Sequence, residues 1–331
     1  MAEKKVLKFG NEYVPTINDG TSAFPRYETY SREKIDSMVK NASGNAAPAV
    51  GGYDWSLRKI TCEGESITEN AVIGYPKYLA DQIKCVTVNI ARGGLPIVGN
   101  FPGQAHDFRA RISAIPADTD AIIVMGDCNS NDTTADNLDS TDPGTWAGRW
   151  NLYVQAIKRS FPTVPLFLVS EYVMTGHAAQ NANTPYLFQR MARKYGAIFI
   201  DLAAETGMSL INAKSVWGLT DSDGVHCSNE AMRIWADVII AKLRATPPPV
   251  WKGVDTIAIA EASVEVQEGN TVALTVSKTG DLSARWESSD ISVACVMGGV
   301  VYGIAPGTAT ITATTRGGNT ASCAVTVTAA G

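Results

Sequence analysis

The sequence lacks most of the features that would indicate nucleic acid or a membrane as a partner. Among its 331 residues, 28 lysines and arginines are outnumbered by 33 aspartates and glutamates, and a net charge of −5 argues against a broadly basic binding surface. No apolar run reaches the length of a membrane span, and the first ten residues contain no apolar segment of a secretory signal. We therefore expect no nucleic-acid partner, no membrane span and no signal peptide.

Cysteine and histidine are also scarce. The six cysteines do not have the spacing of metal ligands, being Cys62, Cys85, Cys128, Cys227, Cys295 and Cys323. Free or buried thiols are the preferred interpretation of the first four, whereas a disulfide between Cys295 and Cys323 is left open. The sequence predicts neither a metal nor a cofactor. A search for a general base is short, because the only histidines are His106, His177 and His226.

The overall composition, with 45% hydrophobic and 18% charged residues, is typical of a globular protein. A chain of this length predicts two or three domains. Residues 1–52 are polar and end in a run of small residues, which suggests an arm or attachment segment followed by a linker. Thr246-Pro-Pro-Pro249 cannot continue a helix. Residues 246–252 are therefore predicted to be a stiff linker between two separate cores, in residues 53–245 and 253–331.

Between residues 53 and 245, strand-like apolar runs alternate with stretches of helical periodicity. The predicted strands are Lys59–Cys62, Cys85–Ala91, Ala121–Met125, Leu166–Val169 and Ala197–Asp201. The predicted helices are Glu69–Ile83, Gln104–Ile115, Trp146–Ser160, Pro185–Tyr195 and Asn229–Arg244. This alternation indicates right-handed βαβ units that build a parallel sheet with helices on both faces. In such sheets, ligands bind beyond the C-terminal ends of the strands.

Residues 253–331 consist of short alternating runs rich in Val, Thr and Ala, separated by turns with Gly or Asp. The predicted strands are Thr256–Ala260, Ser263–Val266, Thr271–Val276, Ala284–Ser288, Thr308–Thr314 and Ala321–Thr328. This pattern is typical of a small antiparallel β-sandwich.

Ser66 lies in the turn that follows the first predicted strand, in the tripeptide Gly64-Glu-Ser66. A serine on a tight turn after a strand can be held with its hydroxyl exposed and its own N–H directed into the same space. One residue then supplies both a nucleophile and an oxyanion donor. The tripeptide alone is weak evidence, because most serines in turns only cap backbone groups.

Asp223 precedes His226 by three residues, in the loop before the last predicted helix. In a turn, this spacing lets the carboxylate accept a hydrogen bond from the imidazole Nδ1–H, which leaves Nε2 free to take a serine proton. Taken alone, the pair is more simply interpreted as two polar loop residues. Gly94 follows the second predicted strand and Asn129 the third, where a backbone N–H and a side-chain amide could donate to an oxyanion. Four such features at one sheet edge favour a shared site.

In order along the chain, Gly64-Glu-Ser66, Gly94, Asn129 and Asp223-Gly-Val-His226 resemble the four blocks of the SGNH (GDSL-type) hydrolases. The resemblance covers roughly residues 55–245. It implies a flavodoxin-like α/β/α three-layer fold and ester hydrolysis through an acyl-serine.

The resemblance also implies a role for each matched residue. Ser66 would be the nucleophile, His226 the base and Asp223 the group that orients the base. The N–H groups of Ser66 and Gly94 and the side-chain amide of Asn129 would form the oxyanion hole.

Departures from the family pattern occur in three blocks, and in the fourth of the family's blocks Cys227 replaces a frequent Pro after the histidine. Glu65 replaces the usual Asp of the first block. Asp127 and Ser130 stand where the third block usually has Gly and Asp, so Asn131 is a rival to Asn129 for the oxyanion role. The carboxylate at position 127 would add negative charge near an oxyanion, which could slow the reaction or tune it towards one substrate.

The C-terminal unit resembles the bacterial immunoglobulin-like domains of the Big2 group, in Arg285-Trp-Glu-Ser-Ser-Asp290, in residues 298–314 and in Cys323-Ala-Val-Thr-Val327. Such domains are spacers or surface-binding modules of cell-surface and phage-particle proteins. Together with the missing signal peptide, this predicts a virion or an extracellular surface as the location. Residues 1–50 would attach the chain to other appendage proteins, and association with further copies of the chain is compatible with the sequence.

These resemblances imply a serine esterase that removes acyl groups, O-acetyl groups foremost, from a surface polysaccharide. The alternative is a structural or adhesive virion or surface protein whose SGNH-fold domain has little or no activity. The C-terminal unit disfavours a third interpretation, a cytoplasmic lipase or thioesterase.

Overall fold

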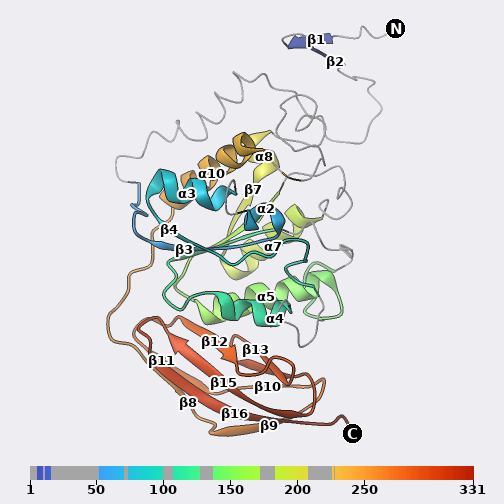
Figure 1. Ribbon diagram of the computed structural model, residues 1–331, viewed down its shortest axis with the longest axis vertical. Helices are drawn as coiled ribbons and strands as arrows, with labels where there is room; N and C mark the ends of the chain where they lie inside the picture. The colour runs from blue at the N-terminus through green and yellow to red at the C-terminus, as the bar shows by residue number, and fades with distance from the viewer. Residues whose placement is uncertain are drawn as a thin grey trace.

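A computed structural model gives the arrangement of most of the chain (Figure 1). The residues that it describes are 6–9, 12–15, 52–70, 74–99, 107–126, 137–171, 183–207, 226 and 228–331. Near the N-terminus, β1 (Val6–Phe9) and β2 (Glu12–Pro15) pair as an antiparallel hairpin. The polar sequence of residues 1–52 does not predict this hairpin.

Five parallel strands form the central sheet. They are β3 (Lys59–Glu63), β4 (Val86–Asn89), β5 (Ala121–Met125), β6 (Leu166–Ser170) and β7 (Ile198–Asp201). Their spatial order is β4-β3-β5-β6-β7, so the chain passes from β3 out to the edge and then returns to the other side of β3. Every residue of β5 and β6 is buried, as expected for inner strands covered on both faces. The reversal places a crevice at the C-terminal ends of β3 and β5, where ligands bind in sheets of this order.

Helices cover both faces of this sheet, as Figure 1 shows. One face carries α3 (Tyr75–Ile83), α8 (Leu202–Thr206) and α10 (Asn229–Arg244). The other carries α4 (Phe108–Arg111), the 3-10 turn η1 (Ile112–Ala114), α5 (Trp146–Ser160) and α7 (Thr184–Tyr195). Large buried rings fill both layers, among them Trp235 against the first face and Trp150 against the second. The predicted α/β/α fold is therefore confirmed.

Two predicted helices are shorter in the structure. Instead of one helix from Glu69 to Ile83, a single turn α2 (Ser66–Glu69) precedes α3, which starts anew after Gly74 with Pro76 in its first turn. Proline is favoured there because the first turn has no use for its missing N–H. Similarly, α4 starts only after Asp107, whose side chain accepts a hydrogen bond from the N–H of Arg109 at 2.9 Å and caps the helix.

The C-terminal unit is a β-sandwich. Its strands are β8 (Thr256–Ile259), β9 (Ser263–Gln267), β10 (Thr271–Ala273), β11 (Val276–Thr279), β12 (Ala284–Ser288), β13 (Ala294–Met297), β14 (Val300–Gly303), β15 (Gly307–Thr315) and β16 (Thr320–Thr328). They form sheets in the orders β12-β15-β16-β9, β10-β14-β13 and β11-β8. Trp286 lies in the core between them, as a sandwich of this kind requires.

The sandwich departs from the sequence analysis at several strands. β11, β13 and β14 are not predicted as separate strands, and β9 pairs with β16 in parallel although all pairs were expected to be antiparallel. β13 escapes prediction because all four of its residues are buried, so that the sequence shows no alternation between apolar and polar residues. Cys295 and Cys323 are both buried thiols, and the disulfide that the sequence left open does not form.

The two units pack directly against each other, with β13 of the sandwich beside α4 and α5 (Figure 1). Met297 of β13 is fully buried and belongs to the same apolar cluster as α4, α5 and α7, so the two units share an apolar contact that the sequence does not predict, although the sandwich also has a core of its own. Gly298 follows it, and a Cβ at this position would lie only 3.1 Å from Ala156 Cα on α5. Outside this contact, Arg316 donates to the backbone oxygen of Thr119 at 2.7 Å and pairs with Asp120 at 2.5 Å.

Candidate active site

The turn after β3 is built around a close backbone approach. A Cβ at Gly64 would lie 2.2 Å from Thr68 Oγ1 and 3.1 Å from the backbone oxygen of Met125, so only glycine fits there. Ser66 follows two residues later as the first residue of α2 and is half-buried. The strand, the tight turn and the single helical turn thus place the Ser66 side chain at the C-terminal edge of the sheet, as the sequence predicts.

His226 meets Ser66 at this edge. The distance from His226 Nε2 to Ser66 Oγ is 3.0 Å, although 160 positions separate the two residues. The helix α10 begins three residues after His226, and the Ser228 hydroxyl caps it by accepting from the N–H of Ala231 at 3.4 Å. A hydroxyl and an imidazole nitrogen at this distance can exchange a proton, which is the first requirement of an activated serine nucleophile.

The loop after β4 brings two glycines close to Ser66. The N–H of Gly93 donates to Glu69 Oε2 at 2.8 Å, and a Cβ on Gly93 would lie 3.3 Å from Ser66 Cβ. Gly94 follows with a φ of +73°, is exposed, and would meet nothing within 4 Å if it had a side chain. The role of the Gly94 N–H as an oxyanion donor stays a prediction.

Other sequence-predicted residues lie outside the described residues. These are Asp223, Asn129 and its rival Asn131, Asp127, His106 and His177. Of the predicted site, the structure therefore brings together Ser66 and His226 and places Gly94 in the neighbouring loop. The roles of Asp223 and Asn129 stay predictions.

Beneath the serine turn lies a buried ion pair that sequence reasoning missed. Arg111 of α4 contacts Glu63 at the end of β3 through Nη2 to Oε1 and through Nε to Oε2 at 3.2 Å, and both side chains are almost fully buried. The hydroxyl of Tyr153 also donates to Glu63 Oε2, at 3.3 Å. Burial by itself would lower the pKa of Arg111, but the charge and hydrogen bonds of Glu63 hold it above its usual value.

The Glu63–Arg111 pair holds the peptide units on both sides of Gly64. The N–H of Gly64 donates to Glu63 Oε1 at 2.8 Å, and its carbonyl oxygen accepts from Arg111 Nη2 at 3.2 Å and from the N–H of Arg92 at 3.0 Å. The sequence carries one signal for this network, a glutamate that directly follows the predicted strand Lys59–Cys62. An isolated charge at a buried strand end calls for a partner, but sequence alone does not say which arginine supplies it.

Asn89 fastens the end of β4 to the serine turn. Its side-chain amide donates to the backbone oxygen of Thr68 at 2.6 Å, and its side-chain oxygen accepts from the N–H of Ala91 at 3.1 Å. The loop that carries Gly93 and Gly94 is thereby attached to α2 at two points, through Asn89 and through Glu69.

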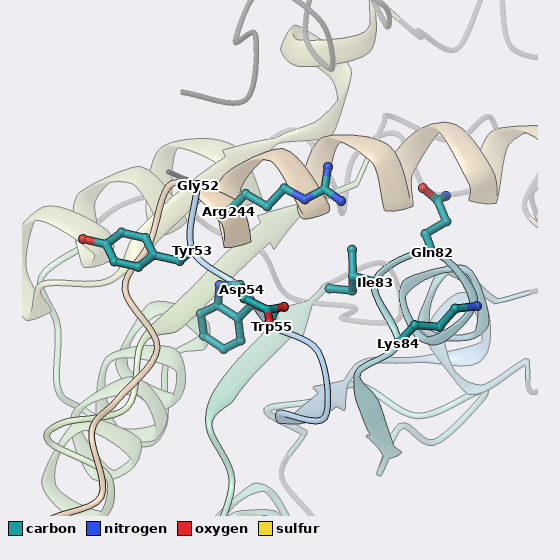
Figure 2. Close-up of a pocket in the computed structure, with 8 residues that line it drawn as sticks. All are labelled: Gly52, Tyr53, Asp54, Trp55, Gln82, Ile83, Lys84 and Arg244. Carbon is teal, nitrogen blue, oxygen red and sulfur yellow. The ribbon is translucent and has the colours of Figure 1, made fainter. Parts of the chain in front are cut away.

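A pocket of about 310 Å³ lies away from this site, at the edge where the strands begin. It is lined by residues 52–55, by Gln82, Ile83 and Lys84 at the end of α3, and by Arg244 at the end of α10 (Figure 2). Of the candidate site residues that the structure describes, Ser66, Gly94 and His226 do not line it. Among the described residues, no group of three or more His, Cys, Asp or Glu side chains could hold a metal ion, and no helix has the length and apolarity to cross a membrane.

Comparison with known proteins identifies the C-terminal unit. Residues 253–325 match the family described as Bacterial Ig-like domain (group 2). This part of the chain is a bacterial Ig-like domain. No curated protein matches the chain.

Solved structures resemble the α/β unit beside the Ig-like domain. A protein from Lactobacillus plantarum is 22% identical, with a TM-score of 0.51, and the match covers 57% of this chain and 98% of that one. At this identity the likeness shows the fold alone. Weaker likenesses include a variant of an acetyl xylan esterase from Geobacillus stearothermophilus, at 14% identity and a TM-score of 0.42, over 57% of this chain and 95% of that one. An aryl esterase from M. smegmatis is 15% identical with a TM-score of 0.40, over 56% of this chain and 97% of that one.

The sheet order and the position of the Ser66 turn agree with the arrangement expected of an SGNH hydrolase. The resemblance found in the sequence is thus confirmed at the level of the fold for the α/β unit, and by family for the Ig-like domain.

Proposed function

We propose that the α/β unit is a serine esterase that hydrolyses acyl esters through an acyl-serine intermediate. The observation that carries this proposal is the 3.0 Å contact between Ser66 Oγ and His226 Nε2 at the C-terminal edge of the sheet. The fold supports it, because ligands of such sheets bind at this edge.

The reaction begins when Ser66 Oγ attacks the acyl carbon and His226 Nε2 takes the hydroxyl proton. The negative charge that develops on the carbonyl oxygen faces the backbone N–H of Ser66 and of Gly94, with the Asn129 amide as a third proposed donor. The alcohol then leaves with the proton held by His226. A water molecule attacks the acyl-serine while His226 takes its proton and returns it to Ser66, which releases the carboxylic acid.

Asp223 completes this proposal as the group that orients His226. Its carboxylate would accept from Nδ1–H and so keep Nε2 directed at Ser66. Because Asp223 precedes His226 by only three residues, its carboxylate can orient the imidazole without a contact between distant parts of the chain.

The proposed natural substrate is an O-acetyl or similar acyl ester on a surface polysaccharide, acted on at a virion or cell surface. The Ig-like domain supports this, because the resemblance found in the sequence implies a spacer or surface-binding module. Residues 1–50 are proposed to attach the chain to other proteins of the same appendage.

The activity is tested with small chromogenic esters of increasing acyl length, alongside Ser66→Ala and His226→Ala. Hydrolysis by the wild type, lost in both variants, is expected. Release of acetate from an acetylated envelope polysaccharide tests the substrate separately. A wild-type protein that hydrolyses none of these esters would favour the alternative, a structural or adhesive appendage that retains the fold without the reaction.

A further inference from the structure

The short helix α4 lies between the serine turn and the Ig-like domain. Its four residues are too few to form a stable helix alone, so their position depends on what packs around them. Arg111 at its end reaches Glu63 and the carbonyl of Gly64. Arg109, two residues earlier, reaches the Ig-like domain instead. One element therefore contacts both the serine turn and the second domain.

The contact with the serine turn is made entirely by buried polar groups. Both oxygens of Glu63 are bonded to Arg111, and one of them also accepts the N–H of Gly64. Any displacement of α4 would therefore move Arg111 relative to the Gly64 peptide, two residues before Ser66. Low-dielectric surroundings make such bonds costly to stretch, so that the turn is expected to follow the helix.

The contact with the Ig-like domain is aromatic and apolar. The guanidinium carbon of Arg109 lies 5.5 Å from the ring centre of Tyr302 on β14, within range of a cation–π interaction. Arg109 is held in this position by the fully buried Asp107, with Nε 3.0 Å from Oδ1 and Nη2 2.5 Å from Oδ2. Met297, on the neighbouring strand β13, joins the apolar cluster that contains Phe108.

The outer face of the β13–β14 hairpin carries buried side chains at this contact. Cys295 pairs across the strands with Tyr302, and Met297 pairs with Val300, while the alternate residues Val296 and Val301 fill the core of the sandwich. An outer face directed at solvent would normally carry polar side chains. Here Cys295 and Met297 are completely buried, and Met297 joins the apolar cluster of the hydrolase unit, so this face is a contact surface for that unit.

We propose that the Ig-like domain positions the nucleophile of the neighbouring unit by fixing α4, and so takes part in the reaction as more than a spacer. Tyr302 and Arg109 are positioning residues in this account, because neither touches the substrate. The inference rests on the proposed esterase function. Its physical basis is that reaction rates fall steeply when a nucleophile is displaced by a fraction of an ångström to an ångström.

The test compares full-length variants that differ at this contact. Tyr302→Leu keeps an apolar side chain but removes the ring face, whereas Tyr302→Phe keeps the ring and serves as the matched control. Arg109→Lys perturbs the contact from the hydrolase side, since lysine keeps the charge beside Asp107 but lacks the planar guanidinium that bonds both Asp107 oxygens and so fixes the group over Tyr302. Thr326→Ala, at an exposed position of β16, controls for substitution of the Ig-like domain in general.

Two readouts are measured well below the unfolding temperature of each variant. For Tyr302→Leu and Arg109→Lys we expect kcat on a small ester to fall about tenfold with KM within twofold of wild type, by analogy with the cost of misplaced groups. We also expect faster amide hydrogen exchange in peptides that cover residues 59–66. Tyr302→Phe and Thr326→Ala should match the wild type in both readouts.

The proposal is overturned if the folded Tyr302→Leu and Arg109→Lys proteins show wild-type kcat and wild-type exchange at residues 59–66, even if their unfolding temperatures fall. Hydrogen exchange separates this failure from a failure of the esterase proposal. If the wild type hydrolyses no ester, the proposed function is wrong, and the exchange at residues 59–66 still decides whether the Ig-like domain holds the serine turn.

Discussion

At the serine turn, single atoms decide which residues fit. Gly64 approaches Thr68 and the carbonyl of Met125 so closely that a methyl group has no space, and this approach allows Ser66 to stand at the end of β3. His226 arrives from the far end of the unit, in the residues just before α10, with its Nε2 3.0 Å from Ser66 Oγ. A reactive serine therefore depends on a contact between two distant parts of the sequence.

Removing either partner of this contact should abolish turnover. Ser66→Ala and His226→Ala are each expected to lower kcat by on the order of 10³–10⁶, and the double variant should be no slower than the worse single variant, because the two groups act as one unit. Steady-state kinetics on a small ester checks this. Losses that multiply in the double variant would show that the two residues act independently.

Substitution of Gly64 should damage both stability and reactivity. In Gly64→Ala the added Cβ overlaps Thr68, which we expect to cost about 1–3 kcal/mol of unfolding free energy. Gly94→Ala is the matched comparison: its Cβ would meet open space, so the cost is limited to about 1 kcal/mol from its positive φ. Urea unfolding gives both values. Equal costs in the two variants would contradict the steric account.

The contact between Ser66 and His226 could be predicted from the sequence, because each stands in a short motif at a strand or helix end. Glu63 and Arg111 could not be paired in this way, since 48 positions separate them and neither belongs to a motif. Their pairing follows from the position of α4 over the end of β3, which is a property of packing. The sequence can identify a buried charge, but the fold decides its partner.

The observed strands and helices match the predicted ones where apolar residues recur in the sequence with a clear helical or strand period. All five predicted strands of the parallel sheet and the long helices α5, α7 and α10 are present close to their predicted bounds. Prediction fails where an element is covered on both sides by different neighbours, as in β13, or is shortened by a local cap, as in α4 with Asp107. The bounds of such elements are determined by tertiary contacts and caps more than by the local periodicity of the sequence.

The turn between β15 and β16 is organised by one buried carboxylate. Asp255 accepts hydrogen bonds from Thr315 Oγ1 at 2.8 Å, from the N–H of Gly317 at 2.8 Å and from Asn319 Nδ2 at 3.0 Å. Burial alone would raise the pKa of Asp255, but these hydrogen bonds outweigh it and the pKa is lowered. Because Arg316 belongs to this turn, the carboxylate also holds the residue that reaches Asp120 of the hydrolase unit.

Acid should therefore loosen this turn. A carboxyl whose pKa is lower in the folded than in the unfolded chain stabilises the fold above its unfolded pKa of about 3.9, and this contribution is lost as the pH falls through the lowered folded value. We expect Asp255→Asn to reduce the unfolding free energy by about 1.5–3 kcal/mol at pH 7, the range for hydrogen bonds to a charged group. The deficit should shrink towards pH 3 in urea unfolding at each pH. A deficit that is constant with pH would contradict the role of the charge.

At the scale of the whole molecule, the two units are in direct contact, and two of their contacts bear on stability. The first is the packing of Met297 and Tyr302 against α4 and α5, and the second is Arg316 against Asp120. The proline-rich linker led to the prediction of two separate cores. A linker shows where one unit ends along the chain, but it does not show whether the two units are in contact. A chain that ends at Ala245 would expose the apolar surface around α4 and is expected to be less stable than the full chain.

Loss of the Arg316 contact should destabilise the full-length protein. The Arg316 and Asp120 side chains are each 8% exposed, so Arg316→Ala leaves a buried carboxylate with Arg58 as its remaining ion-pair partner, and we expect a loss of about 1–3 kcal/mol. Lys77→Ala removes an exposed ion pair with Asp81 and should cost at most about 0.5 kcal/mol. Chemical unfolding of both variants makes the comparison. Equal effects would mean that the buried contact adds nothing to stability.

The central claim, that Ser66 is a nucleophile activated by His226, is tested most directly by covalent labelling. The full-length protein is treated with a fluorophosphonate, which reacts with activated serines, and the adduct is located by peptide mass spectrometry. We predict a single adduct on Ser66, at a rate that falls by several orders of magnitude in His226→Ala. An adduct elsewhere on the chain, no adduct at all, or labelling of Ser66 at an unchanged rate in His226→Ala would contradict the assignment.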